Sequence, residues 1–350
     1  MTPSVPTARR SSLTSALGFG DKLFSSASER RFAKDIESGL EAVEEGLLRE
    51  MSFADDIADV TSRYLLDAGG KRVRPTLTLL TAQLGDGSNP SVVTAAEALE
   101  ITHLASLYHD DVMDEANMRR GVPTAQNVWG NSVAILTGDL LFARASKLIA
   151  SLGEGAIKLQ ADTFERLCLG QLHETIGPRE GEDPIAHYLQ VLADKAGSLI
   201  AASAEMGVIF SNAPQAYRVP VTIFGEKVGV AFQLIDDVID LSAEQEQTGK
   251  TPGTDLRSGV STLPLLYLCD LARSDAAARD LLTRIELDVA NGAADDTQIA
   301  ELRDHEVTHR TLAEAHRWAC EAVEALAPLP DGPVKKALTR FADTIVDRSN

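Results

Sequence analysis

Two short segments of the sequence each contain three aspartates at the same spacing, and both follow a strongly apolar run. Residues i, i+1 and i+4 of a helix lie close together, so each segment predicts a tight group of carboxylates. Carboxylates this close repel one another, and partial burial of the helix makes that repulsion costly. The segments are HDDVMDEA and LIDDVIDL, with Asp110, Asp111 and Asp114 in the first and Asp236, Asp237 and Asp240 in the second.

Magnesium would remove this repulsion. Mg²⁺ prefers oxygen ligands and usually completes its coordination shell with water and substrate phosphates. Two facing groups therefore predict a diphosphate bound through bridging metal ions. One DDxxD segment alone is as readily a solvated helix end, but the repeat favours the metal site. His109-Asp110 also suggests an HD-type metallo-phosphohydrolase, although the other histidines show no ligand pattern and that interpretation leaves the second segment unexplained.

Basic side chains gather in two further segments. GGKRVRP (residues 69–75) carries Lys71, Arg72 and Arg74 behind two glycines, and Arg119 and Arg120 follow the first aspartates. Glycines allow a close backbone approach, and guanidinium groups bind phosphate oxygens. By itself GGKRVRP is more readily a surface turn. Beside the aspartates, it predicts a second diphosphate held directly by cationic side chains.

Helices must position these residues. From about residue 30 onward Ala, Leu, Glu and Arg dominate, and apolar residues recur at three- and four-residue steps. No long linker interrupts residues 31–350, so we expect one all-α domain, a single large helical bundle. Residues 1–30, rich in Ser, Thr, Pro and Arg, predict a flexible N-terminal arm. No apolar run is long enough to predict a membrane span.

Charge and cysteine content narrow the class of protein. With 52 acidic against 33 basic residues, the formal charge of -19 argues against a nucleic-acid partner and suits a protein that collects cations. Cys168, Cys269 and Cys320 lie far apart in the sequence. This spacing argues against a zinc site or a disulfide framework and fits a reducing compartment, so we expect a cytoplasmic protein.

The order of motifs resembles the trans-isoprenyl diphosphate synthases (polyprenyl synthetases), and the long-chain bacterial type in particular. The resemblance runs from about residue 35 to the C-terminus. It implies an isoprenoid synthase fold with a central cavity. It also implies a homodimeric, Mg²⁺-dependent prenyltransferase that adds isopentenyl diphosphate head-to-tail to an allylic diphosphate. The motifs are GGKRVRP, HLASLYHDDVMDEANMRRG, GDLLFARA, GQLHE, DKAGSL, FQLIDDVIDL, GKTPGTDL and STLP.

The resemblance further implies roles for individual residues. Three Mg²⁺ ions, bound by the two aspartate groups, would clamp the allylic diphosphate, which Arg119, Lys195 and Gln233 would also contact. Spacing alone favours a core histidine at position 103, and Lys195 is open to interpretation as an ordinary exposed lysine. No His or Glu of the motifs is an evident general base, and the resemblance implies that the released diphosphate takes the proton. Isopentenyl diphosphate would be held by four basic residues: Lys71, Arg74, His103 and Arg120.

Two positions depart from the family pattern. Ala196 stands where the family often has Thr, so a hydroxyl near the reacting carbon is missing. Val260 stands where a lysine often precedes TLP, which removes one cation near the allylic diphosphate. Slower ionisation or a different closing contact would be consistent with these departures. Both aspartate groups and the other basic positions remain, so we expect an active enzyme.

Product length should depend on the helix before the first aspartates. In the family, bulky aromatics four or five residues before the first aspartate resemble a floor that stops elongation early. This chain has the small Ala105 and Ser106 there, which favours a long polyprenyl product such as a quinone side-chain precursor, with geranylgeranyl diphosphate as the alternative. The residues expected to line the tunnel are Leu99, Thr102, Ala105, Ser106 and Tyr108.

Two other classes stay open at this point. A class I terpene cyclase is helical and carries one DDxxD, but its second metal site usually has an Asn/Ser/Glu pattern. A non-catalytic partner subunit of a heterodimeric synthase tends to lose one aspartate group, whereas this chain keeps both. The lipid-like product suggests peripheral release at a membrane, without an anchor in this sequence.

Overall fold

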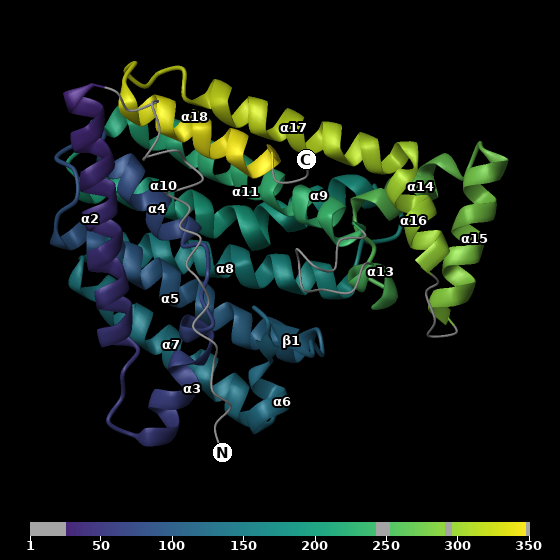
Figure 1. The fold of residues 1–350 in the computed structure, drawn as a ribbon, viewed down its shortest axis with the longest axis horizontal. Coiled ribbons are helices and arrows are strands. Elements are labelled where there is room, and N and C mark those ends of the chain that lie inside the picture. The colour runs from purple at the N-terminus through teal and green to yellow at the C-terminus, as the bar shows by residue number, and fades with distance from the viewer. Residues whose placement is uncertain (1–25, 243–252, 291–295, 348–350) are drawn as a thin grey trace. The chain divides into compact units, whose positions relative to one another are not determined.

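The computed structural model describes residues 26–242, 253–290 and 296–347 (Figure 1). Helices make up nearly all of the regular structure of these residues, and their only strands form one short hairpin. The all-α class is thereby confirmed. Residues 1–25, most of the predicted N-terminal arm, lie outside this description. Among the described helices, none combines the length and the apolar character needed to cross a bilayer.

The described chain divides into two compact units. The first contains the described residues up to Phe164, with Leu199–Ile223 and Leu326–Arg340. The second contains Glu165–Ser198, Phe224–Ala325 and the described residues from Phe341 onward. The expectation of one domain over residues 31–350 stays a prediction.

Most helices belong to one unit, whereas α8 (Glu154–Ile176), α10 (Ser198–Phe210), α11 (Arg218–Asp240) and α18 (Pro333–Val346) contribute residues to both. The other elements of the first unit are α2 (Ala27–Glu50), α3 (Asp56–Asp67), α4 (Val73–Ala82), α5 (Pro90–Met113), β1 (Met118–Arg119), β2 (Val122–Pro123), α6 (Ala125–Trp129), α7 (Asn131–Ser151) and η2 (Gln215–Tyr217). Those of the second are α9 (Pro184–Leu192), η1 (Ala193–Gly197), α13 (Thr254–Arg257), α14 (Leu263–Leu271), α15 (Ala276–Ala290), α16 (Asp296–Asp304) and α17 (Glu306–Ala325).

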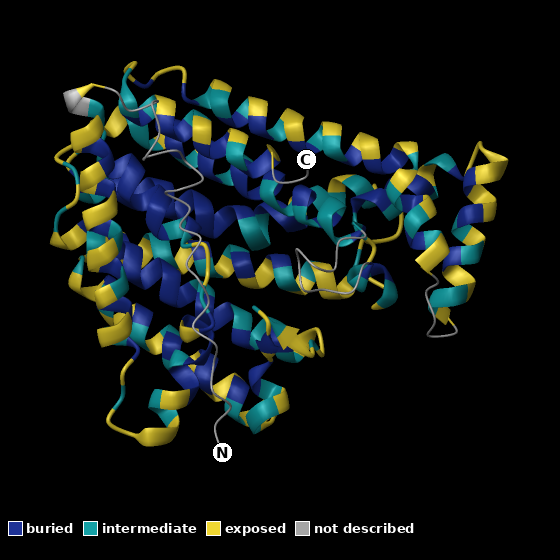
Figure 2. Ribbon diagram, in the orientation of Figure 1, coloured by how far each residue is buried: buried dark blue, intermediate teal, exposed yellow. Residues whose placement is uncertain are grey.

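Helix α5 is the buried centre of the first unit (Figure 2). It begins where Asn89 accepts hydrogen bonds from the N–H groups of Ser91 and Val92, with Pro90 in the first turn. Its own small and apolar residues lie on all of its faces, as expected of a helix that neighbouring helices cover on every side. Those neighbours include α2, α4 and α7. The helix therefore delivers its C-terminal residues from a rigid core.

A tight hairpin follows α5. Strands β1 and β2 pair Arg119 with Val122. The two turn residues between them, Arg120 and Gly121, have φ values of 53° and 78°. Positive φ at both central positions is the type I′ turn that suits a two-residue hairpin. This turn fixes where the two consecutive arginines lie.

Candidate active site

Both aspartate groups lie at the C-terminal end of a helix. In the first acidic group (Asp110, Asp111 and Asp114), two residues are in the last turn of α5 and Asp114 caps it. In the second acidic group, Asp237 and Asp240 are in the last turn of α11, and Asp236 directly precedes that turn. A helix C-terminus carries partial negative charge, so carboxylates there are unfavourable without nearby cations. The second acidic group is Asp236, Asp237 and Asp240.

Asp111 is the most deeply buried member of the first acidic group, with no exposed surface. Its Oδ1 atom accepts from Nε of Arg119 over 2.7 Å and lies 2.6 Å from Nη2 of the same residue. Its Oδ2 atom is also buried and has no hydrogen-bond partner among the described residues. Burial raises the pKa of Asp111, against the opposing effect of Arg119. A cation would satisfy the remaining oxygen and favour the charged form.

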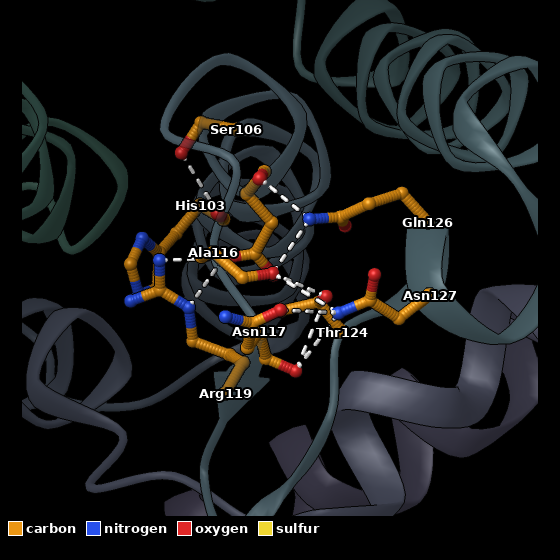
Figure 3. A network of polar contacts seen from close by, with 9 residues as sticks. His103, Ser106, Ala116, Asn117, Arg119, Thr124, Gln126 and Asn127 are labelled. Atoms are coloured by element: carbon orange, nitrogen blue, oxygen red, sulfur yellow. Dashed lines mark hydrogen bonds and ion pairs between the residues drawn. The ribbon is translucent and has the colours of Figure 1, made fainter. Parts of the chain in front are cut away.

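Side chains after the hairpin hold the turn that ends α5 (Figure 3). Gln126 Nε2 donates to the backbone carbonyls of Asp111 and Ala116, over 2.7 Å in each case. Thr124 Oγ1 donates to the same Ala116 carbonyl over 2.5 Å. These bonds fix the backbone around the first acidic group, so its carboxylates are positioned before any ligand arrives.

The arginines of the two basic segments surround a buried glutamate of α5. Glu100 Oε1 accepts from Nη1 of Arg72 over 3.3 Å, and Nε of Arg72 donates to Glu44 over 2.6 Å. Arg74 and Arg120 also interact electrostatically with Glu100. Three guanidinium groups thus share two carboxylates, which leaves an excess of positive charge.

Burial makes this excess costly. It lowers the pKa of Arg74 to about 10 and that of Arg120 to about 10. Burial and the neighbouring arginines also lower the pKa of His103 well below its ordinary value, so this imidazole is neutral at pH 7. Nε of Arg74 is buried without a hydrogen-bond partner in the described part of the chain. A polyanion fits this basic cluster (Arg72, Arg74, His103 and Arg120) because it would supply both acceptors and negative charge.

The backbone of the basic cluster is strained. Arg72 and Arg120 both adopt left-handed conformations, with φ of 52° and 53°. The carbonyl of Gly69 accepts from Nη1 of both arginines. A Cβ atom on Gly70 would lie 2.5 Å from Nη1 of Arg72 and 3.0 Å from Nη2 of Arg120. The glycines therefore let the loop close around two guanidinium groups. Such strained residues cluster at functional sites.

The second acidic group has its own partners in the second unit. Asp237 is 3% exposed, and its Oδ2 accepts from the hydroxyl of Tyr188 over 2.8 Å. Burial raises the pKa of Asp237 well above its ordinary value, although the bond from Tyr188 opposes this shift. Asp240 Oδ2 accepts from the backbone N–H of Asp255 over 3.1 Å. The carboxylates are therefore held in place, at a position where a cation would favour their charged form.

The remaining expected ligands of the allylic diphosphate are also placed. Lys195 lies in η1, and its Nζ is 2.5 Å from Oε2 of Glu174. Gln233 is half-buried on α11, three residues before Asp236. Of the two positions that depart from the family pattern, Ala196 lies in η1. Val260 lies just before α14, and 42% of its surface is exposed. Part of the GKTPGTDL motif, residues 249–252, falls outside the described chain.

The expected tunnel residues are all buried on α5. The hydroxyl of Tyr108 donates to the carbonyl of Thr61 over 2.5 Å and accepts from the N–H of Leu65, so it is anchored on α3. Leu99 belongs to an apolar core that includes Ile149 and Met206. These contacts give both residues a packing role. The tunnel itself stays a prediction.

Two partners were not identified from the sequence. Glu100 is the counter-ion of the basic cluster, and its signal was an acid, one of two with Glu97, within the apolar run before His103. Tyr188, the partner of Asp237, lies seven residues before Lys195, a spacing that places both on one helical face in a regular helix. Its sequence context is otherwise unremarkable.

The HD-type alternative finds no support. His109 Nε2 lies 3.0 Å from the carbonyl of Ile135 and 3.3 Å from Asp139. Three or more His, Cys, Asp or Glu side chains do not meet at a ready-made metal site anywhere in the described residues. A cation bound to the unpartnered oxygen of Asp111 would therefore need substrate or water oxygens to complete its coordination shell.

Known proteins show the same combination of sequence and fold. A family model described as "Polyprenyl synthetase" matches residues 55–301. The chain is 42% identical over 322 residues to the nonaprenyl diphosphate synthase of Mycobacterium tuberculosis, which covers 91% of this chain and 94% of that protein.

Solved structures agree. The polyprenyl synthase of Caulobacter crescentus, complexed with calcium and isoprenyl diphosphate, has a TM-score of 0.81 at 29% identity over 92% of this chain and 98% of its own. The geranylgeranyl pyrophosphate synthase of Corynebacterium glutamicum, in a complex of the same kind, has a TM-score of 0.76 at 40% identity over 90% and 96%. From the matched family model, the relatives and the shared all-α fold, the chain belongs to the polyprenyl synthetase family and is a prenyltransferase that elongates prenyl chains.

Proposed function

We propose that the chain adds isopentenyl diphosphate units head-to-tail to an allylic diphosphate and yields an all-trans polyprenyl diphosphate. The observation that carries this proposal is a pair of complementary groups that both include residues of α5. The buried carboxylate of Asp111, which has one oxygen without a partner, lies in the last turn of α5, and the same helix contributes His103 to the buried basic cluster with its excess positive charge. These groups suit a cation-bound diphosphate and a directly bound diphosphate respectively.

The allylic diphosphate would be bound through divalent cations. When bound, Mg²⁺ neutralises the negative charge that develops on a departing diphosphate. Arg119 orients the Asp111 carboxylate, and Tyr188 orients that of Asp237. From the family resemblance, we propose three ions for the two acidic groups, with Arg119, Lys195 and Gln233 as further contacts of this diphosphate. The proposed cation ligands are Asp110, Asp111, Asp114, Asp236, Asp237 and Asp240.

Isopentenyl diphosphate would be bound by Lys71 and by three members of the basic cluster, Arg74, His103 and Arg120. Its oxygens would accept from the buried Nε of Arg74, which the described residues leave without an acceptor. His103 is neutral there and would donate or accept a hydrogen bond without adding charge. Glu100 keeps the arginines in position when no diphosphate is present.

The chemical step then follows from charge. The allylic C–O bond breaks, the diphosphate leaves with the electron pair, and the double bond of isopentenyl diphosphate attacks the allylic carbon. A proton is lost to the released diphosphate, which restores the double bond. Water must be excluded, because it would capture the cation.

The product is proposed to be long, in line with the small Ala105 and Ser106, and a quinone side chain is the expected use. Geranylgeranyl diphosphate is the second candidate, because the 40% identity to the Corynebacterium enzyme is close to the 42% identity to the nonaprenyl synthase.

We further propose a cytoplasmic homodimer that releases its product at a membrane surface. Large apolar side chains remain exposed in the first unit, among them Ile135 at 42%, Leu136 at 65% and Ile157 at 47%. In the proposed dimer, the partner subunit would cover these side chains. Sedimentation analysis of the purified protein would test the assembly.

One incubation tests the function. Purified protein is given farnesyl diphosphate, isopentenyl diphosphate and Mg²⁺, and the products are measured by mass spectrometry. Linear products longer than geranylgeranyl diphosphate support the proposal, and a product that stops at geranylgeranyl diphosphate supports the second candidate. A cyclic hydrocarbon would instead indicate a terpene cyclase. Absence of any reaction would favour a non-catalytic partner subunit.

A further inference from the structure

Lys195 lies in an unusual piece of backbone. Residues Ala193–Gly197 form the five-residue π-helical turn η1, directly after α9. Its flanking residues Leu192 and Ser198 keep right-handed helical angles, so η1 is a widened turn within a helical path. Such π-helical turns are rare and are frequent at functional sites.

Glycines allow η1 to touch the helices on both sides. A Cβ atom on Gly170 of α8 would lie 2.7 Å from the backbone nitrogen of Lys195. A Cβ atom on Gly197 would lie 3.0 Å from the carbonyl oxygen of Glu226 on α11. Both distances are too short for a side chain without movement of the backbone. The turn is therefore clamped by direct backbone contact.

An arginine completes the clamp. Nε of Arg166 donates to Oδ1 of Asp194 over 2.9 Å, and its Nη2 lies 2.8 Å from both that atom and Oε2 of Glu226. The other oxygen of Asp194 accepts from Gln190 over 2.9 Å. One guanidinium group thus joins α8, η1 and α11 next to Lys195.

Three residues of α8 at four-residue steps make these contacts. Arg166 holds Asp194, Gly170 meets the backbone of Lys195, and Glu174 accepts from its ammonium group over 2.5 Å. Residues at i, i+4 and i+8 lie along one face of a helix. This face of α8 therefore holds both the backbone of Lys195 and the ammonium group at the end of its side chain.

We propose that the π-helical turn and the α8 face form a positioning device for the Lys195 ammonium, with Arg166 as its positioning residue. The inference rests on the proposed contact between Lys195 and the allylic diphosphate. Arg166 touches no substrate in this scheme. It binds Asp194 and Glu226, and these contacts hold the backbone of η1 that carries Lys195.

A double-mutant cycle tests this coupling. Arg166→Met and Lys195→Met are each expected to lower kcat/KM for farnesyl diphosphate by about tenfold or more, with little change in KM for isopentenyl diphosphate. The double variant should be no slower than Lys195→Met alone, because Arg166 acts through the ammonium that is already absent. Lys158→Met, an exposed basic position on the same helix, is the matched control and should behave as the wild type.

Gly170→Ala gives a second approach that keeps every charge. Its Cβ would displace the backbone of Lys195, so kcat/KM for farnesyl diphosphate should fall in the wild-type background and stay constant in the Lys195→Met background. The losses in kcat/KM could instead multiply when Lys195→Met is combined with Arg166→Met or with Gly170→Ala. In that case the clamp is merely structural and the inference is wrong, while the proposed function stands. If Lys195→Met alone has wild-type kinetics, the proposed role of Lys195 fails and the inference fails with it.

Discussion

Arg119 places two nitrogens, Nε and Nη2, on a single oxygen of Asp111, at 2.7 and 2.6 Å. The second oxygen of that carboxylate is buried with no partner in the part of the chain described. A protein that needed Asp111 only as an ion-pair partner would gain more from a bidentate pair. The one-sided contact instead orients the carboxylate and leaves Oδ2 for a ligand.

Asp111→Asn should therefore remove activity more than stability. An amide keeps the shape but binds a cation poorly, so we expect kcat to fall by about 100-fold or more. Steady-state rates with labelled isopentenyl diphosphate would measure this. Asp331→Asn, whose side chain is 98% exposed, is the control. A rate above half of the wild-type value would contradict the assignment.

Glu100→Gln should uncover the charge excess of the basic cluster. Removal of this buried carboxylate leaves arginines uncompensated, so we expect a loss of roughly 3 kcal/mol in the free energy of unfolding. Inorganic pyrophosphate should restore more stability to the variant than it adds to the wild type, because it supplies the missing charge. Denaturation with and without pyrophosphate measures both effects.

Glu44→Gln is the matched control for that experiment. Glu44 also pairs with Arg72, but its side chain is 19% exposed and therefore less buried than that of Glu100. Its loss should be smaller and its response to pyrophosphate closer to that of the wild type. Equal responses of all three proteins would contradict the prediction that pyrophosphate replaces the charge of Glu100.

Glu97 should make stability depend on pH. Burial raises its pKa to about 7 in the folded protein, despite Arg49 nearby. The folded state then binds this proton more tightly than the unfolded state does. The free energy of unfolding should fall as pH rises from about 4.5 to about 7, by roughly 1–3 kcal/mol from this group. Glu97→Gln should remove that part of the slope in denaturation measured at pH 5 and pH 8. An unchanged slope would contradict the shifted pKa.

Ala105→Phe should shorten the product if the α5 face lines the growing chain. Ala105 is fully buried, and its carbonyl would lie 3.1 Å from a Cβ on Gly138 of α7, so the larger ring should also cost about 1–3 kcal/mol of stability. Mass spectrometry gives the product length, and Ala105→Ser is the small control. A folded variant with unchanged product length would remove this tunnel assignment.

Gly207→Ala should destabilise the first unit. A Cβ atom there would lie 2.1 Å from Oγ1 of Thr81 and 2.3 Å from the carbonyl oxygen of Thr78, where α10 crosses α4. We expect a loss of about 1–3 kcal/mol in the free energy of unfolding. Gly155→Ala on α8, where the added atom meets nothing within 4 Å, should instead be neutral or stabilising. Equal effects of the two changes would show that the close crossing is absent.

Much of the architecture and chemistry could be predicted from local sequence. The three- and four-residue apolar periodicity predicts helices, and the DDxxD spacing predicts clustered carboxylates, because both depend only on the geometry of one helix. The order of motifs likewise indicated the family, which the matched model and relatives confirm.

Contacts between residues far apart in the sequence were decided only by the tertiary structure. The pairing of Glu100 with Arg72 and the bond from Tyr188 to Asp237 join residues 28 and 49 positions apart. The left-handed conformations of Arg72 and Arg120 and the clamp of η1 by Arg166 also depend on packing against neighbours. No local pattern encodes such contacts, since they arise when helices pack and bury charge that must then find a partner.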